Sequence, residues 1–255
     1  MIQPRRQTIG SDLLEEVQLY VLHPEKINTF GLRKLEHQAG ILAKTDAAAS
    51  STVRAAIAAF RWDAEGVEYW TNNALKLEKS FATLTNAAVN KGLVGDVRAA
   101  AEYALEAFHL ATSDANAASN ACDALMFDGR FDEALAIANR FINSSDAFGV
   151  IAKDASAALD ALAKLEIEQD EVRRQIEIGV HVAANLHTTV SAIENFVVND
   201  YEDGSRFVIS LHVIGDIHKE IALDEALVEK LLDDPMWDPM KLSIEFHYLT
   251  DAGIK

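Results

Sequence analysis

The sequence predicts a mostly α-helical protein, an α-solenoid of stacked helix pairs followed by a small α+β domain. Apolar residues recur with a helical period of about 3.6 as far as about residue 188. Two segments between Phe81 and Phe141 superimpose at a spacing of 34 residues, the length of one helix–turn–helix unit. After His187 the apolar period changes to about 2, which is typical of strands. We therefore expect a helical-repeat domain over 1–188 and a second domain over 189–255.

The first helices follow from apolar stripes bounded by capping and breaking residues. A short helix is expected to end at Pro24, and Thr29 is the expected cap of the next one. A degenerate repeat is expected over 53–77. Trp62 and Trp70, eight residues apart, are expected near one helical face as core residues. At least eight helices should precede the first strand.

The two superimposed segments share small residues where helices must approach closely. The aligned pairs are Ala87 with Ala121, Ala88 with Cys122, Gly95 with Gly129, Ala100 with Ala134, Ala104 with Ala138 and Ala107 with Phe141. In each copy the glycine ends the first helix, and the alanines let the second helix pack closely. The helix pairs are expected at about 80–92 with 96–111, and at about 116–128 with 132–142.

The second copy resembles the G-x-Y-x-E-A half of a tetratricopeptide repeat, through the run GRFDEA at Gly129–Ala134 followed by Ala138 and Phe141. The first copy is weaker, since Val97 replaces the aromatic residue. Neither copy has the family's early large aromatic or its final proline. The resemblance covers about residues 80–143 and implies a tetratricopeptide-like solenoid that binds other proteins. Generic helical hairpins are the alternative.

Two longer helices are expected before the period changes, one after a cap at about 143–146 and one over 169–187. The remaining chain is expected to form two strands, a helix and a closing strand. The predicted segments are strands at 189–199, 206–214 and 242–248 and a helix capped by Asp224. This β-β-α-β order, with the helix as a right-handed crossover, implies a sheet with one helix-covered face.

Composition limits the class of protein. With 255 residues and 49% hydrophobic content, the chain should fold rather than stay disordered. No run approaches the ~20 apolar residues of a membrane span, and the start lacks the apolar stretch of a signal peptide. We therefore expect a soluble, cytoplasmic protein with no membrane partner. The single cysteine, Cys122, excludes an internal disulfide framework and is expected to be buried at a helix contact.

The formal net charge is −17, from 40 acidic and 23 basic residues. Nucleic acid would be repelled by such a charge, and a basic protein or peptide is the better partner.

Motifs for catalysis and metal binding are weak. The run Val213–His218 resembles the metal-binding G-D-x-H of calcineurin-like metallophosphoesterases, but the later ligands of that family are missing, so a turn after a strand is expected instead. Of the late histidines, His212 and His247 are expected to be neighbours on an exposed sheet face, as a solvated or pH-sensitive surface rather than a zinc site. No metal, cofactor or catalytic residue is predicted.

On the tetratricopeptide analogy, the first helix of each pair lines a binding groove. The expected groove residues are Thr85, Asn86, Asn116, Ser119, Asn120, Asp123 and Phe127, and the expected acidic rim is Asp200, Glu202 and Asp203. Because the groove positions carry no Lys or Arg, a reader of terminal carboxylates is not expected. An extended peptide or a basic helix suits this polar, mildly acidic face better.

The sequence therefore predicts a non-catalytic interaction module, such as an adaptor, a chaperone or an antitoxin-like neutralising protein, that binds a basic partner. One alternative is an architectural subunit that forms homo-oligomers through the edge of its sheet. The other is a small hydrolase with a site between the two domains, using some of His187, His212 and Asp216.

Overall fold

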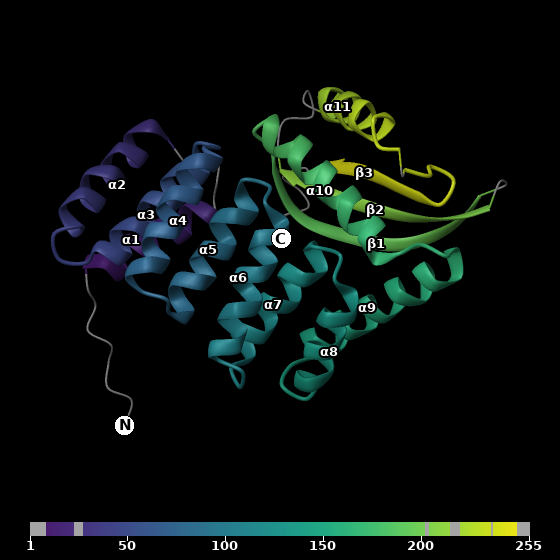
Figure 1. Ribbon diagram of the computed structural model, residues 1–255, viewed down its shortest axis with the longest axis horizontal. Helices are drawn as coiled ribbons and strands as arrows, with labels where there is room; N and C mark the ends of the chain where they lie inside the picture. The colour runs from purple at the N-terminus through teal and green to yellow at the C-terminus, as the bar shows by residue number, and fades with distance from the viewer. Residues whose placement is uncertain (1–8, 23–27, 202–203, 215–219, 236, 249–255) are drawn as a thin grey trace. The chain divides into compact units, whose positions relative to one another are not determined.

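The fold comes from a computed structural model of the chain (Figure 1). It describes all residues except 1–8, 23–27, 202–203, 215–219, 236 and 249–255. In the described part, ten helices precede the first strand, which confirms the mostly helical prediction. The chain divides into two compact units, Met1–Val94 and Gly95–Lys255.

Unit 1 consists of helices. Its elements are α1 (Ile9–Leu22), α2 (Thr29–Leu42), α3 (Ala47–Phe60), α4 (Ala64–Leu77) and α5 (Phe81–Leu93). The prediction that Thr29 caps α2 is wrong, because the side chain of Asn28 accepts the N–H of Gly31 at 2.8 Å and Thr29 is already helical. Asp46 caps α3 in the same way, which places a helix start at Ala47 in the Ala- and Ser-rich stretch.

The core of unit 1 is built from small clusters. The main cluster joins α1, α2 and α3 and contains Leu13, Val17, Leu35, Ala39, Leu42, Val53, Ala56 and Ile57. Trp62 lies outside it, in the turn between α3 and α4, with a φ of 58°. The prediction that Trp62 and Trp70 share one helical face is therefore wrong, because this left-handed residue ends α3 before α4 begins.

Unit 2 begins with five helices. They are α6 (Val97–Leu110), α7 (Ala115–Phe127), α8 (Phe131–Phe141), α9 (Asp146–Leu165) and α10 (Gln169–Asn185). The helices of both predicted pairs are present, but the division between the units falls between α5 and α6, inside the first aligned copy.

The turns inside the helix pairs share one backbone feature. Gly95 has a φ of +85° and Gly129 a φ of +70°, and each lies two residues after one helix and two before the next. A Cβ at Gly129 would lie 3.1 Å from Arg173 Cγ, so space as well as conformation favours glycine there. Trp62 takes the equivalent place between α3 and α4, as a degenerate repeat predicts.

Close packing of α7 against α8 follows the predicted small residues. Ala121, Cys122, Ala134 and Ala138 are fully buried, and so is Phe131 at the start of α8. Burial raises the pKa of the Cys122 thiol to about 12, so the thiol stays protonated and acts as a packing group.

The rest of unit 2 has the predicted β-β-α-β order. Its elements are β1 (Thr189–Tyr201), β2 (Gly204–Ile214), α11 (Glu220–Leu232) and β3 (Leu242–Tyr248). β2 is the central strand, antiparallel to β1 and parallel to β3. The prediction that Asp224 caps the helix is wrong, since α11 is already helical at Glu220.

One face of the sheet belongs to the core of the helices. The buried residues of this face are Phe207, Ile209, Leu211, Val213, Leu242, Ile244 and Phe246, and they join residues of α9, α10 and α11 in one cluster. Figure 1 shows α10 and α11 beside the sheet. A Cβ at Gly179 would lie 2.5 Å from Leu211 Cδ1, so the glycine lets α10 approach β2. Strands thus begin at Thr189 as predicted, within a unit whose described part also contains six helices.

Candidate binding surfaces

One face of α7 carries four polar side chains at helical spacing. We call Asn116, Ser119, Asn120 and Asp123 the α7 polar face, since positions i, i+3, i+4 and i+7 lie on one side of a helix. Three of the side chains are exposed and Ser119 is half-buried. Among the described residues, none of the four side chains makes a hydrogen bond or an ion pair. The sequence-predicted α7 residues therefore form a surface with unused donors and acceptors.

Asp123 is the only charged member of this face. Water reaches its side chain, yet the surrounding protein removes part of its hydration, and this burial raises the pKa of the carboxyl group. No cation offsets that cost in the described part of the chain, because desolvation is the sole cause of the shift. A positively charged group from another molecule would restore the lost interaction.

Asp128, five residues further along the chain, does have a cation beside it. Its side chain is only 3% exposed, and Arg173 Nη2 donates to its carboxylate at 3.0 Å. Burial raises the pKa of Asp128 as well, but Arg173 lowers it and offsets part of the shift. Asp128 is a structural group, whereas Asp123 is available to a partner.

The other predicted groove residues have different surroundings. Phe127 is half-buried and packs against the core cluster of unit 2. Thr85 and Asn86 belong to α5 in unit 1, and each donates to its own helix, to the carbonyls of Phe81 at 2.9 Å and Ala82 at 2.8 Å. These two side chains are therefore less available than the α7 polar face.

Several predicted residues fall outside the described part of the chain. Glu202 and Asp203 of the acidic rim do so, and Asp200 belongs to the end of β1. Asp216 also lies outside, whereas His187 is an exposed residue just before β1.

The expected pair of histidines on the open sheet face is present. The rings of His212 and His247 stack with centroids 5.6 Å apart. His247 Nε2 lies 2.9 Å from Glu245 Oε1, and Ser210 Oγ donates to the same oxygen at 3.0 Å. Over the residues that the structure describes, no group of three or more His, Cys, Asp or Glu side chains is arranged to hold a metal ion.

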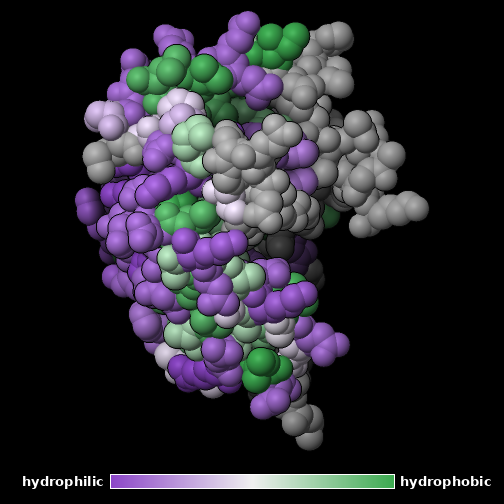
Figure 2. Space-filling model, turned by 90° about the vertical axis from the view of Figure 1, so that its right-hand side faces the viewer, coloured by the Kyte–Doolittle hydropathy of each residue, from purple (hydrophilic) through white to green (hydrophobic). Residues whose placement is uncertain are grey.

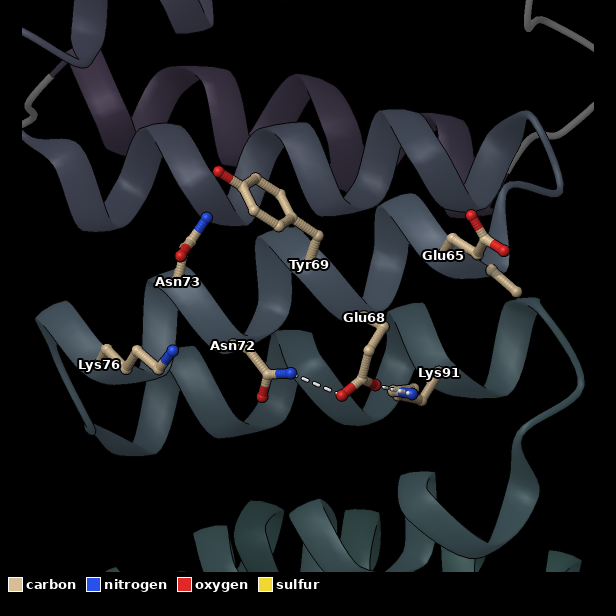
Figure 3. A pocket seen from close by; sticks show the side chains of 8 residues that line it. Glu65, Glu68, Tyr69, Asn72, Asn73, Lys76 and Lys91 are labelled. Atoms are coloured by element: carbon tan, nitrogen blue, oxygen red, sulfur yellow. Dashed lines mark hydrogen bonds and ion pairs between the residues drawn. The ribbon is translucent and has the colours of Figure 1, made fainter.

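A pocket along α4 was not predicted from the sequence. It has a volume of about 630 Å³ and is lined by Ala64, Glu65, Glu68, Tyr69, Asn72, Asn73, Lys76 and Lys91. Lys91 Nζ and Asn72 Nδ2 each donate to Glu68 at 2.5 Å, as Figure 3 shows. Because these polar groups bind one another, the pocket has fewer unused donors than the α7 polar face. The sequence signal that could have indicated this polar face of α4 is the recurrence of polar residues at i, i+3, i+4 and i+7.

The surface also carries exposed aliphatic side chains. On the face seen in Figure 2, hydrophilic residues predominate among those in colour, and separate hydrophobic groups interrupt them. On α11, Ile221, Val228 and Leu232 are exposed.

Comparisons with known proteins give no relatives. The chain matches no protein-family model, no curated protein and no solved structure. Among the described helices, none has the length and apolar character needed to cross a bilayer.

Proposed function

We propose that the protein is a non-catalytic interaction module that binds a basic segment of a protein or peptide partner on the α7 polar face. The observation that carries this proposal is the α7 polar face itself, four polar side chains on one side of a helix that make no hydrogen bond or ion pair with the described residues, with the carboxylate of Asp123 among them. A Lys or Arg side chain of a partner would pair with that carboxylate.

The rest of the face suits an extended peptide backbone. Asn116 and Asn120 each offer an amide that both donates and accepts, and Ser119 offers a hydroxyl group between them. These groups can bind the N–H and C=O groups of a partner without demanding one side chain. Specificity for basic residues would then come from Asp123, in a stack of helix pairs that resembles tetratricopeptide repeats.

The charge of the whole chain supports the same partner class. A net charge of −17 attracts basic molecules over a distance and mainly speeds their encounter. The proposed acidic rim of Asp200, Glu202 and Asp203 would contribute to this attraction, whereas the α7 polar face would decide how long the complex lasts.

The test measures binding of a short Lys- and Arg-containing peptide to matched variants. Asp123→Asn should weaken binding about tenfold, since the amide oxygen can still accept a hydrogen bond but loses the charge that makes such a bond worth roughly 1.5–3 kcal/mol. The control is Asp154→Asn, an exposed carboxylate on α9 that makes no hydrogen bond or ion pair with described residues. It removes the same charge and should change binding less than twofold.

Asn120→Ala tests the polar part of the face separately and should mainly speed dissociation. If Asp123→Asn and Asn120→Ala both stay folded and bind the peptide as tightly as Asp154→Asn does, the α7 polar face is not the binding surface.

A further inference from the structure

A second pocket lies within unit 1, among α2, α3 and α4. It has a volume of about 260 Å³ and is lined by Glu36, Arg54, Ile57, Ala58, Arg61, Asp63 and Trp70. Four of these seven residues are charged, two of each sign. The chemistry of the pocket therefore depends on which of these charges are already paired.

Three of the four charges have partners inside unit 1. Arg61 Nη1 donates to Glu36 Oε1 at 2.6 Å, and this hydrogen bond lowers the pKa of Glu36. The carboxylate of Asp63 caps α4 by accepting the N–H of Gly66 at 2.9 Å.

Arg54 is the remaining charge. Its guanidinium lies over the ring of Trp70, 4.6 Å from the ring centroid, and the side chain is half-buried. Within the described residues it makes no hydrogen bond or ion pair with a carboxylate, although its charge acts on Glu36 at longer range and helps to lower the pKa of that carboxyl group. The contact with the ring is not a hydrogen bond to an oxygen acceptor, so the guanidinium N–H groups keep their capacity to donate to one.

We propose that this pocket binds one oxyanion group, a carboxylate or a phosphate, through the edge of the Arg54 guanidinium. The planar fork of arginine matches both kinds of oxyanion with two parallel hydrogen bonds. The contact with Trp70 restrains the Arg54 side chain, which reduces the entropy lost on binding. The pocket volume admits a single group of side-chain size.

This site is independent of the α7 polar face. It lies in the other compact unit, and it would bind an anion through Arg54, whereas the α7 polar face would bind a cation through Asp123. Because the chain as a whole is acidic and repels anions, we expect weak binding, with a Kd of about 1 mM for a small ion.

The experiment follows the indole N–H signal of Trp70 by NMR, assigned through its loss in Trp70→Phe. Inorganic phosphate and acetate are titrated separately, with chloride keeping the ionic strength constant. We expect a saturable shift of the Trp70 signal, while the signal of Trp237, in unit 2, stays in place. Saturation by phosphate alone supports the pocket with a phosphate ligand, and saturation by both ions supports it with oxyanions in general. Saturation by acetate alone supports a carboxylate ligand.

Variants of Arg54 test whether its guanidinium binds the ion. Arg54→Gln should raise the Kd of the ion at least tenfold. Arg54→Lys, which keeps the charge but loses the planar fork, should raise it about threefold. The matched control is Arg33→Gln, an exposed arginine that acts on the same Glu36 but does not line the pocket. It should leave the Kd within twofold.

Arg54→Lys decides the question if Arg54→Gln does not fold. The absence of a saturable shift with either ion, or equal saturation in the parent and in the folded Arg54 variants, would overturn the proposal.

Discussion

Unit 1 and unit 2 build their cores over different distances in the sequence. The main cluster of unit 1 joins three consecutive helices, from Leu13 to Ile57. The cluster of unit 2 joins helices to β2, β3 and α11, from Val97 to Phe246. Unit 1 therefore depends on contacts between neighbouring helix pairs, whereas unit 2 also needs strands from the far end of the chain.

The two proposed sites depend on charges of opposite sign, one in each unit. In unit 1 the charge is Arg54, which lies over the ring of Trp70 and forms no ion pair with the described residues. In unit 2 it is Asp123, which has a raised pKa and forms no ion pair with the described residues. An acidic protein can thus offer one surface for cations and one for anions, because local pairing, and not net charge, decides which charges remain available.

The largest expected effect separates the two cores. Phe131→Ala should lower the stability of unit 2 by about 3–5 kcal/mol, and Leu35→Ala that of unit 1 by about 2–5 kcal/mol, since both side chains are fully buried. The indole NMR signals of Trp62 and Trp70 report on unit 1, and that of Trp237 on unit 2. Each substitution should shift the thermal transition of its own unit. If the transition temperature followed by all three indole signals fell equally in either variant, the two units would unfold together.

The next effect compares one ion pair in each unit. Arg173→Ala should cost about 3 kcal/mol, because it leaves the buried carboxylate of Asp128 without its donor. Glu68→Ala should cost less, about 1 kcal/mol, although Lys91 is only 8% exposed, since a lysine stem can extend its ammonium group to water. Urea unfolding measures both.

The control is the double variant Arg173→Ala with Asp128→Asn, which should recover part of the loss by removing the unpaired charge. If Arg173→Ala and Glu68→Ala lowered the free energy of unfolding equally, burial of the remaining charge would not explain a difference between the two ion pairs.

The smallest effect concerns Asp123 and depends on pH. A raised folded-state pKa means that the carboxyl group favours folding when protonated. That contribution is complete below the ordinary value of 3.8 and is lost as the pH rises through the folded pKa. At pH 7 Asp123→Asn should therefore raise stability slightly, by less than about 0.5 kcal/mol, and at pH 3 the difference from the parent should vanish.

Melting temperatures at both pH values measure this effect, and Asp154→Asn controls for the loss of one exposed carboxylate elsewhere in unit 2. A gain that persists at pH 3 would contradict an electrostatic origin.

The sequence by itself determined the helix pairs and their turns. Gly95 and Gly129 could be identified because a left-handed turn residue favours glycine, and the alanine positions followed from a spacing of 34 residues. The change to strands at Thr189 followed from the change of period. Local choices between similar residues were harder: Asn28 and Thr29 are both good caps, and Trp62 gives no sign of a left-handed conformation.

Only the tertiary structure decided which charged side chains have no opposite charge beside them and can bind a ligand. The helical period placed Asn116, Asn120 and Asp123 on one side of α7, but it could not show that no cation faces them among the described residues. Arg54 and Trp70 meet across two helices, 16 residues apart. A sequence period reports the direction of a side chain from its own helix, whereas pairing depends on what neighbouring elements place opposite it.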